Sequence, residues 1–146
     1  MFRGRYEHTI DPKGRLSIPA RYREELVARS ITTLILTEGD HSVWAFPLDE
    51  WEQLEERLRQ HPQLSPERRN VARLMVASAK ECPVDRAGRT LIPPELREFA
   101  GLKRDVMITG ALDWFEIWSR DRWAEHRQTL RVGFDDMTRK LSERTL

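Results

Sequence analysis

Two short stretches of the sequence carry the residue types that could form a functional site. The stretch Asp11–Pro19 reads Asp-Pro-Lys-Gly-Arg-Leu-Ser-Ile-Pro, and the stretch Asp85–Pro93 reads Asp-Arg-Ala-Gly-Arg-Thr-Leu-Ile-Pro. Asp, Gly, Arg, Ile and Pro recur in register, 74 residues apart. A guanidinium group beside a glycine turn can contact a phosphate or bind guanine through two parallel hydrogen bonds. The two Gly-Arg pairs therefore indicate nucleic-acid binding as the chemistry of this chain.

The first copy of the motif is the more basic one. Lys13 and Arg15 share its turn, and Ala87 stands at the position of Lys13 in the second copy. We therefore expect Arg15 to be the main DNA contact. The alternative role for a motif arginine is a surface ion pair with a neighbouring carboxylate, and this role suits the second copy better. The candidate DNA-binding residues are Arg15, Lys13, Arg3 and Arg5, with Arg86 and Arg89 as secondary candidates. The residues expected to shape the two turns are Asp11, Gly14, Asp85 and Gly88.

An enzyme would need groups that this sequence does not provide. It contains no glycine-rich phosphate loop, no H-E-x-x-H and no G-x-S-x-G motif. Its four histidines and its single Cys82 are too widely spaced for a metal-ligand pattern. Asp11 and Asp85 stand at the first position of a turn, where a carboxylate accepts backbone N–H bonds, so they need no catalytic role. We expect no enzymatic activity, no metal, no cofactor and no small-molecule substrate.

The elements around the first motif must hold Arg15 at an exposed corner. Residues 5–10 alternate between apolar and polar side chains, as in a strand. Asp11-Pro12-Lys13-Gly14 has the residue types of a turn, and Arg15–Ile18 resumes the alternation. The sequence therefore predicts a hairpin with a positively charged corner, in which Arg15 points outward.

The remainder of each half follows the same order of elements. A short helix over 20–27, strands over 33–37 and 42–46 and a longer helix from Pro47 recur in the second half, where Trp123 matches Trp51 at an offset of 72. Because about 50 residues form only a marginal core, the two halves are expected to share one sheet about a pseudo-twofold axis. The predicted divisions are repeat 1 over 5–53, a helical connector over 54–80, repeat 2 over 81–125 and a C-terminal helix over 126–146.

Composition narrows the class of protein further. The 146 residues are 39% hydrophobic and 34% charged, with a net charge of only +1, so the whole chain is no general polyanion binder. The charge is local: residues 1–23 hold six basic and two acidic residues, whereas residues 48–60 hold two basic and five acidic residues. Uncharged stretches such as Ser30–Thr37 are too short to cross a bilayer, and the N-terminus lacks the apolar core of a signal peptide. We expect a cytoplasmic protein associated with the nucleoid.

The motif residues resemble those of the MraZ family of bacterial transcriptional regulators. The resemblance rests on Met1-Phe2-Arg3-Gly4, His8, Asp11, Lys13-Gly14-Arg15-Leu16 and Pro19, and on Asp85, Gly88-Arg89 and Ile92-Pro93 in the second copy. It extends over nearly the whole chain. It implies an α+β fold in which two SpoVT/AbrB-like repeats form a double-split, swapped-hairpin β-barrel with flanking helices. It also implies ring-like homo-oligomers.

The same resemblance implies a function. Members of this family are oligomeric, sequence-specific repressors that bind double-stranded promoter DNA at short direct repeats upstream of the cell-division and cell-wall gene cluster. Carried over to this sequence, the DNA contact falls on Arg15, with Lys13 and Arg3 as neighbours. The alternative is that the AbrB-type fold serves here as an antitoxin-like module for oligomerisation or protein partners, without reading a DNA sequence.

Overall fold

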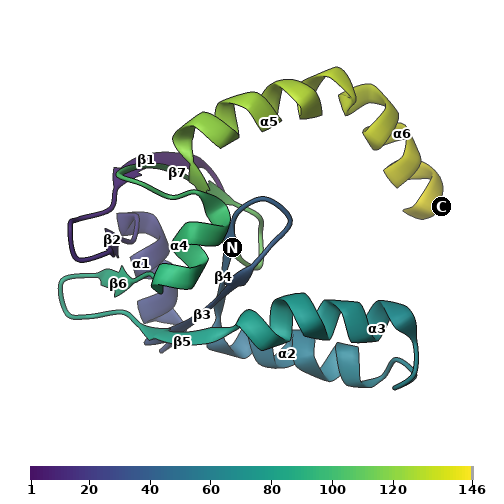
Figure 1. The fold of residues 1–146 in the computed structure, drawn as a ribbon, viewed down its shortest axis with the longest axis horizontal. Coiled ribbons are helices and arrows are strands. Elements are labelled where there is room, and N and C mark those ends of the chain that lie inside the picture. Colours follow the sequence, from purple (N-terminus) through teal and green to yellow (C-terminus); the bar gives the residue numbers. More distant parts are fainter. Residues whose placement is uncertain (146) are drawn as a thin grey trace.

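The computed structural model describes residues 1–145, which fold into helices and antiparallel strands (Figure 1). The α+β class expected from the sequence is confirmed. Leu146, the last residue of the expected C-terminal helix, lies outside the described residues. The first half contains β1 (Arg5–Thr9), β2 (Arg15–Ser17), α1 (Ala20–Ala28), β3 (Thr33–Glu38), β4 (Val43–Pro47), α2 (Leu48–Arg59), α3 (Pro66–Val71) and the π-helical turn η1 (Ala72–Val76). The second half contains β5 (Lys80–Pro83), β6 (Arg89–Leu91), α4 (Pro94–Ala100), β7 (Asp105–Gly110), β8 (Phe115–Ser119), α5 (Arg120–Val132) and α6 (Phe134–Thr145).

The two repeats exchange strands within one six-stranded sheet. Its strand order is β1-β7-β8-β4-β3-β5, and every neighbouring pair is antiparallel. The first strand of repeat 1, β1, pairs with β7 of repeat 2, and β5 of repeat 2 pairs with β3 of repeat 1. Strands β4 and β8 meet in the middle, where Val43 faces Ile117. Each repeat therefore completes the sheet of the other, as the expected pseudo-twofold arrangement requires.

The hairpin expected between residues 5–10 and 15–18 needs a correction. The turn forms, but its two arms separate: β1 pairs with β7, and β2 pairs with β6 in a second, two-stranded sheet. A bridge between Ile10 and Leu16 joins the arms next to the turn. The arms separate because β1 gains five paired residues along β7, from Arg5 opposite Thr109 to Thr9 opposite Asp105. Alternation of side chains predicts a strand but does not say which strand it joins.

A larger hydrophobic cluster lies between the sheets and helices α1 and α4, and a smaller cluster of Ile35, Phe46 and Trp51 lies beside α2. Tyr22 and Leu26 of α1 and Leu96 of α4 are almost completely buried in the larger cluster, together with side chains from both repeats. The ribbon β2–β6 covers the larger cluster with Leu16 and Thr90, which are 0% and 1% exposed. The opposite side of the ribbon is therefore directed outward. Among residues 1–145, no helix is both long enough and apolar enough to span a membrane.

Cys82 offers a chemical test of the strand exchange, because it lies on β5 opposite Leu34 of repeat 1. Its side chain is 4% exposed, and burial raises the pKa of the thiol from 9.0 to about 11. The thiolate is the reactive form, so at pH 8 the folded protein should react with a disulfide reagent about 100-fold more slowly than an accessible thiol. The same reaction in guanidinium chloride supplies the reference rate. Equal rates in the folded and unfolded protein would show that β5 does not hold its place on β3.

Candidate nucleic-acid interface

The two motif turns share an internal hydrogen bond from the backbone N–H of their arginine to the carboxylate of their first residue. In the first, the Asp11 carboxylate accepts the backbone N–H groups of Lys13 and Arg15, each at 2.9 Å. In the second, the Asp85 carboxylate accepts the N–H of Arg89 at 2.9 Å. The Arg15 N–H group lowers the pKa of the Asp11 carboxyl, and the Arg89 N–H group lowers the pKa of Asp85 in the same way. Both carboxylates therefore remain ionised and hold their turns at neutral pH.

Each glycine of the two turns has a positive φ angle, +87° at Gly14 and +77° at Gly88. A glycine adopts this conformation without steric cost, whereas other residues rarely do. The backbone N–H group of each glycine donates to the carbonyl of the Asp that starts its turn, at 2.9 Å in both copies. The structure thus places the four expected turn residues in one repeated geometry.

Both motif arginines form an ion pair with the carboxylate of their own turn. The distance from Arg15 Nε to Asp11 Oδ2 is 2.6 Å, and that from Arg89 Nε to Asp85 Oδ2 is 3.3 Å. An arginine paired with a carboxylate, the alternative that suited the second copy, is thus present in both turns. The ion pair of the first turn is the shorter of the two. Within residues 1–145, the Nη atoms of Arg15 have no hydrogen-bond partner, so the ion pair orients the guanidinium and leaves its outer edge available for a ligand.

The register of β2 and β6 brings Arg15 and Arg89 to the same surface. Arg15 lies opposite Leu91, and Arg89 lies opposite Ser17, so the two arginines are diagonal neighbours on the outer face. Such neighbours have Cβ atoms about 7 Å apart. Lys13 and Arg86 are exposed on the two turns that flank this face, on the left in Figure 1. We call the outer face with Lys13, Arg15, Arg86 and Arg89 the basic ribbon.

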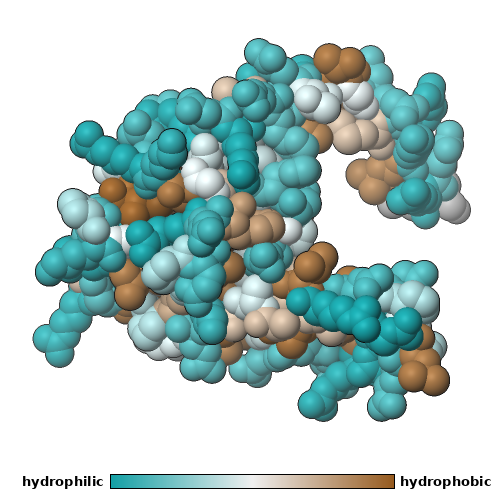
Figure 2. Space-filling view, viewed as in Figure 1, coloured by the Kyte–Doolittle hydropathy of each residue, from teal (hydrophilic) through white to brown (hydrophobic). Residues whose placement is uncertain are grey.

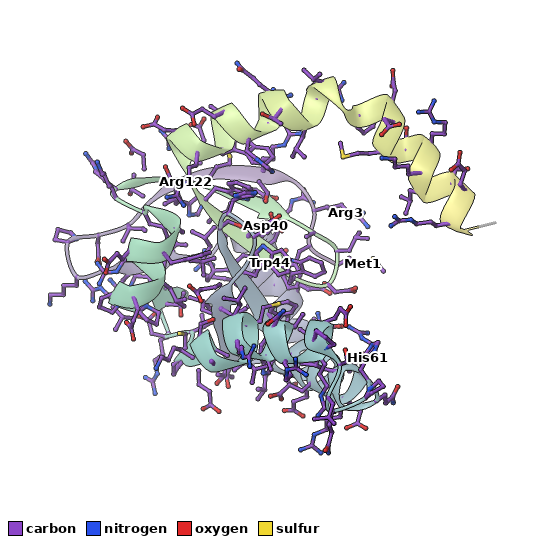
Figure 3. All side chains as sticks on the ribbon, turned by 45° about the vertical axis from the view of Figure 1, so that its right-hand side comes forward. Met1, Arg3, Asp40, Trp44, His61 and Arg122 are labelled. Carbon is purple, nitrogen blue, oxygen red and sulfur yellow. The ribbon has the colours of Figure 1, made fainter. Side chains whose placement is uncertain are left out.

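Arg3 and Arg5 do not lie beside the basic ribbon of the same chain. Arg5 occupies the far end of β1, opposite Thr109, and its guanidinium lies over the ring of Trp123 at 5.4 Å. Four residues of extended strand separate it from Thr9 by about 14 Å. Figure 3 shows Arg3 close to Met1, across the molecule from the motif turns. A direct role of Arg3 and Arg5 in DNA binding stays a prediction that the arrangement within one chain does not support.

The structure adds two arginines that the sequence reasoning missed. A Cβ atom built on Gly14 would lie 2.8 Å from Cζ of Arg97, and one built on Gly88 would lie 2.3 Å from Cδ of Arg23. Each glycine is therefore covered by an arginine from a helix of the other repeat. Arg23 and Arg97 are themselves 74 residues apart, in register with the motif, and this spacing is the signal that could have identified them.

Backbone hydrogen bonds join the two turns to each other. The Ile18 N–H donates to the carbonyl of Gly88 at 2.8 Å, and the Ile92 N–H donates to the carbonyl of Gly14 at 2.9 Å. His8 of β1 supports β2, since its Nδ1 atom lies 2.7 Å from the carbonyl oxygen of Ser17. The basic ribbon is thus a product of both repeats and requires both for its shape.

Comparison with known proteins finds the same two repeats that the structure shows. The family model described as "MraZ protein, putative antitoxin-like" matches the chain twice, over residues 1–74 and 75–144. A "Transcriptional regulator MraZ" of Desulfitobacterium hafniense (strain Y51) is 48% identical over 126 residues, which is 86% of each chain. Proteins of the same name from Caldanaerobacter subterraneus subsp. tengcongensis and Azotobacter vinelandii are 42% and 46% identical. They cover 97% and 84% of this chain, and 96% and 82% of their own length.

These matches establish the family of the chain and its class as a transcriptional regulator. The two matched segments begin 74 residues apart, which is the spacing of the motif turns. Transcriptional regulators of this kind are not enzymes, so the expectation of a non-enzymatic protein is confirmed. Over the described residues, no group of three His, Cys, Asp or Glu side chains is placed to hold a metal ion. With a repeat match across nearly its full length and relatives above 40% identity, the chain belongs to the MraZ family of transcriptional regulators.

Proposed function

We propose that this protein is an oligomeric, sequence-specific repressor that reads promoter DNA through the basic ribbon. The observation that carries the proposal is the outer face of β2–β6, where Arg15 and Arg89 lie side by side with outward guanidinium groups. The major groove of B-DNA admits a two-stranded ribbon, and arginine can bind guanine O6 and N7 there. The flanking Lys13 and Arg86 are exposed and suited to contact phosphates.

Arg15 is proposed as the main reading residue of the pair. Its ion pair with Asp11 is 0.7 Å shorter than that of Arg89 with Asp85, as the two distances of 2.6 and 3.3 Å show. A side chain already held in one orientation loses less conformational freedom when it binds. The second turn then serves mainly as the partner that completes the core and positions β2, through the hydrogen bond from Ile18 to Gly88.

Assembly makes up for the small contact area of one ribbon. One chain offers few base contacts, whereas linked copies on short direct repeats gain affinity through effective concentration. We infer a ring-like homo-oligomer bound at direct repeats upstream of the cell-division and cell-wall gene cluster, acting in the cytoplasm at the nucleoid. Within each chain, the two sheets are inferred to close into one swapped-hairpin barrel, since the Ile10–Leu16 bridge joins β1 to β2.

Genome-wide capture of DNA bound to the tagged full-length protein tests this function. We expect enrichment of a few sites made of short direct repeats, one of them in front of the cell-division gene cluster, and increased transcription there when the gene is deleted. In vitro affinity should fall steeply with salt, because phosphate contacts release counterions. Capture without any enriched sequence, or binding that salt does not weaken, would instead favour the antitoxin-like protein-partner module.

A further inference from the structure

A groove on repeat 2 has the dimensions of a binding site but no part in the basic ribbon. It is a cavity of about 780 Å³ between the sheet and α5. Arg5 and Asp40, which is labelled in Figure 3, lie at its edge. Its walls are formed by residues of β7, β8 and α5, namely Thr109, Glu116, Trp118, Trp123, His126 and Leu130. We call this cavity the α5 groove.

The corresponding surface of repeat 1 is covered by a helix. Strands and helices of the two repeats match at an offset of 72 residues from β3 and β7 onward, so Thr109 corresponds to Thr37 and Trp123 to Trp51. In the first half of the chain, Met75 of η1 packs against the smaller hydrophobic cluster of Ile35, Phe46 and Trp51. The Thr37 hydroxyl donates to the Met75 carbonyl at 2.6 Å. The α5 groove is therefore the repeat 2 version of a site that takes a helix.

The α6 helix of the same chain is not placed to fill the groove. In repeat 1, six residues (60–65) connect α2 to α3, and Figure 1 shows the two helices turned back alongside each other. In repeat 2, the single residue Gly133 connects α5 to α6. Two antiparallel helices need a connection of about two to five residues, so one residue bends the path but cannot reverse it. Figure 1 accordingly shows α6 continuing away from the body in an arc.

The α6 segment carries an apolar face in the open. Phe134 and Met137 are 46% and 42% exposed, and Val132, just before the connection, is 91% exposed. Figure 2 shows apolar residues at the crest of this arc and on its concave side, which is directed toward the space beside the body. Residues at spacing three share one helix face, so Met137 and Lys140 lie side by side. Lys140 pairs with Asp136 of its own helix at 3.0 Å, and it is 64% exposed, so its ammonium group stays accessible to a second carboxylate.

The groove is suited to an amphipathic helix with a basic residue. At the position of Trp44 in repeat 1 it has Glu116, whose carboxylate accepts the indole N–H of Trp118 at 3.0 Å. Burial raises the pKa of Glu116, and Asp40 contributes to this rise. Among the residues that the structure describes, Glu116 has no ion pair, so its carboxyl is open to an arriving ammonium group. Trp123 and Leu130 supply apolar surface beside it, and the buried Trp118 lies beneath them.

We propose that the α5 groove of one chain holds helix α6 of a second copy of this chain. The inference rests on the assembly part of the proposed function and specifies the contact: repeat 1 fills its site from within, and repeat 2 fills its site from a neighbour. The donor and acceptor surfaces differ, so the contact is head-to-tail and can close into a ring when it repeats.

Two full-length variants and their mixture test the contact by solution mass without DNA. Met137→Glu places a charge on α6, and Leu130→Arg places one at the groove wall; both positions are at least one-third exposed, so the fold should persist. We expect each variant alone to sediment as a single 17.3 kDa chain, whereas the wild type forms a multi-subunit species. The mixture should form a 1:1 heterodimer, because one variant retains a working α6 and the other a working groove. Val27→Glu is the matched control at an exposed apolar residue of α1 and should leave the wild-type mass unchanged.

Several results would overturn the proposal. They are a wild-type mass for Met137→Glu or Leu130→Arg, a mixture that stays monomeric, or a monomeric wild type. Circular dichroism of each variant confirms that it is folded before its mass is compared. The DNA-binding proposal is tested separately, by measuring the binding of the wild type to promoter DNA in a gel shift. An oligomer insensitive to the two substitutions but active on DNA would reject the α5 groove contact alone.

Discussion

Replacing Arg15 with alanine should abolish sequence-specific DNA binding while fold and assembly stay intact. A bidentate arginine–guanine contact contributes about 1–3 kcal/mol of discrimination, and a complex on repeated sites loses one such contact from every engaged subunit. For two engaged subunits, the expected loss of affinity is about 100-fold or more. The fold should be little affected, because Arg15 is one-third exposed and its pair with Asp11 is a surface ion pair.

Arg89→Ala is the matched control, since it removes the same side chain from the other turn of the basic ribbon. We expect a smaller loss of affinity there. Titration of a fluorescent promoter fragment with both variants at one fixed salt concentration measures the difference. Affinity like that of the wild type for Arg15→Ala would reject the site, and a larger loss for Arg89→Ala would reverse the ranking of the two turns.

Phe2→Ala should produce the largest loss of stability. The Phe2 ring is completely buried, with ring centroids 5.0 Å from Tyr22 and 5.4 Å from Phe115. Its backbone forms a bridge with Leu112, through N–H···O bonds of 2.8 and 2.9 Å. Removal of a buried phenylalanine ring typically lowers the free energy of unfolding by about 3–5 kcal/mol. For a chain of this size, the midpoint of thermal unfolding should fall by roughly 10 °C or more.

Urea unfolding of Phe2→Ala and Leu112→Ala separates the ring from the bridge. Leu112 is 56% exposed, so its truncation should change the free energy of unfolding by less than about 1 kcal/mol. Leu112→Ala keeps the backbone bonds to Phe2, so an effect of Phe2→Ala as small as that of Leu112→Ala would show that the buried ring does not fasten the N-terminus. Phe2 is thus part of the core, although it precedes the first strand.

Local patterns in the sequence were sufficient to predict the turns and the faces of the strands. Asp at the first turn position and Gly at the fourth have a direct physical reason, and the alternation correctly placed Leu16 inward. The strand partners could not be predicted in this way, because the partner of β1 lies about 100 residues further along the chain, at β7. Periodicity is a local property, whereas pairing depends on which distant strands bury their faces together.

The surroundings of the candidate site show the same limit. Closeness in sequence suggested that Arg3 and Arg5 help Arg15, but an extended β1 carries Arg5 to the other end of the sheet, over Trp123. Arg23 and Arg97, in contrast, are brought to the turns by helices that cross from the opposite repeat. The length of a strand places Arg5 away from the turns, and the direction of a helix places Arg23 and Arg97 beside them. The spacing of charged residues in the sequence does not reveal either placement.

The exchange of β1 and β5 between repeats has a consequence for symmetry. Two identical half-length chains could form the same sheet, but both halves would then present the same turn and the same helix site. A covalent link between the halves lets them diverge: Lys13 corresponds to Ala87, and six connecting residues before α3 contrast with the single Gly133 before α6. The two halves of the joined chain are therefore not equivalent, and the molecule has a direction. This polarity would allow a chain of copies to run in one direction along DNA repeats that themselves all point the same way.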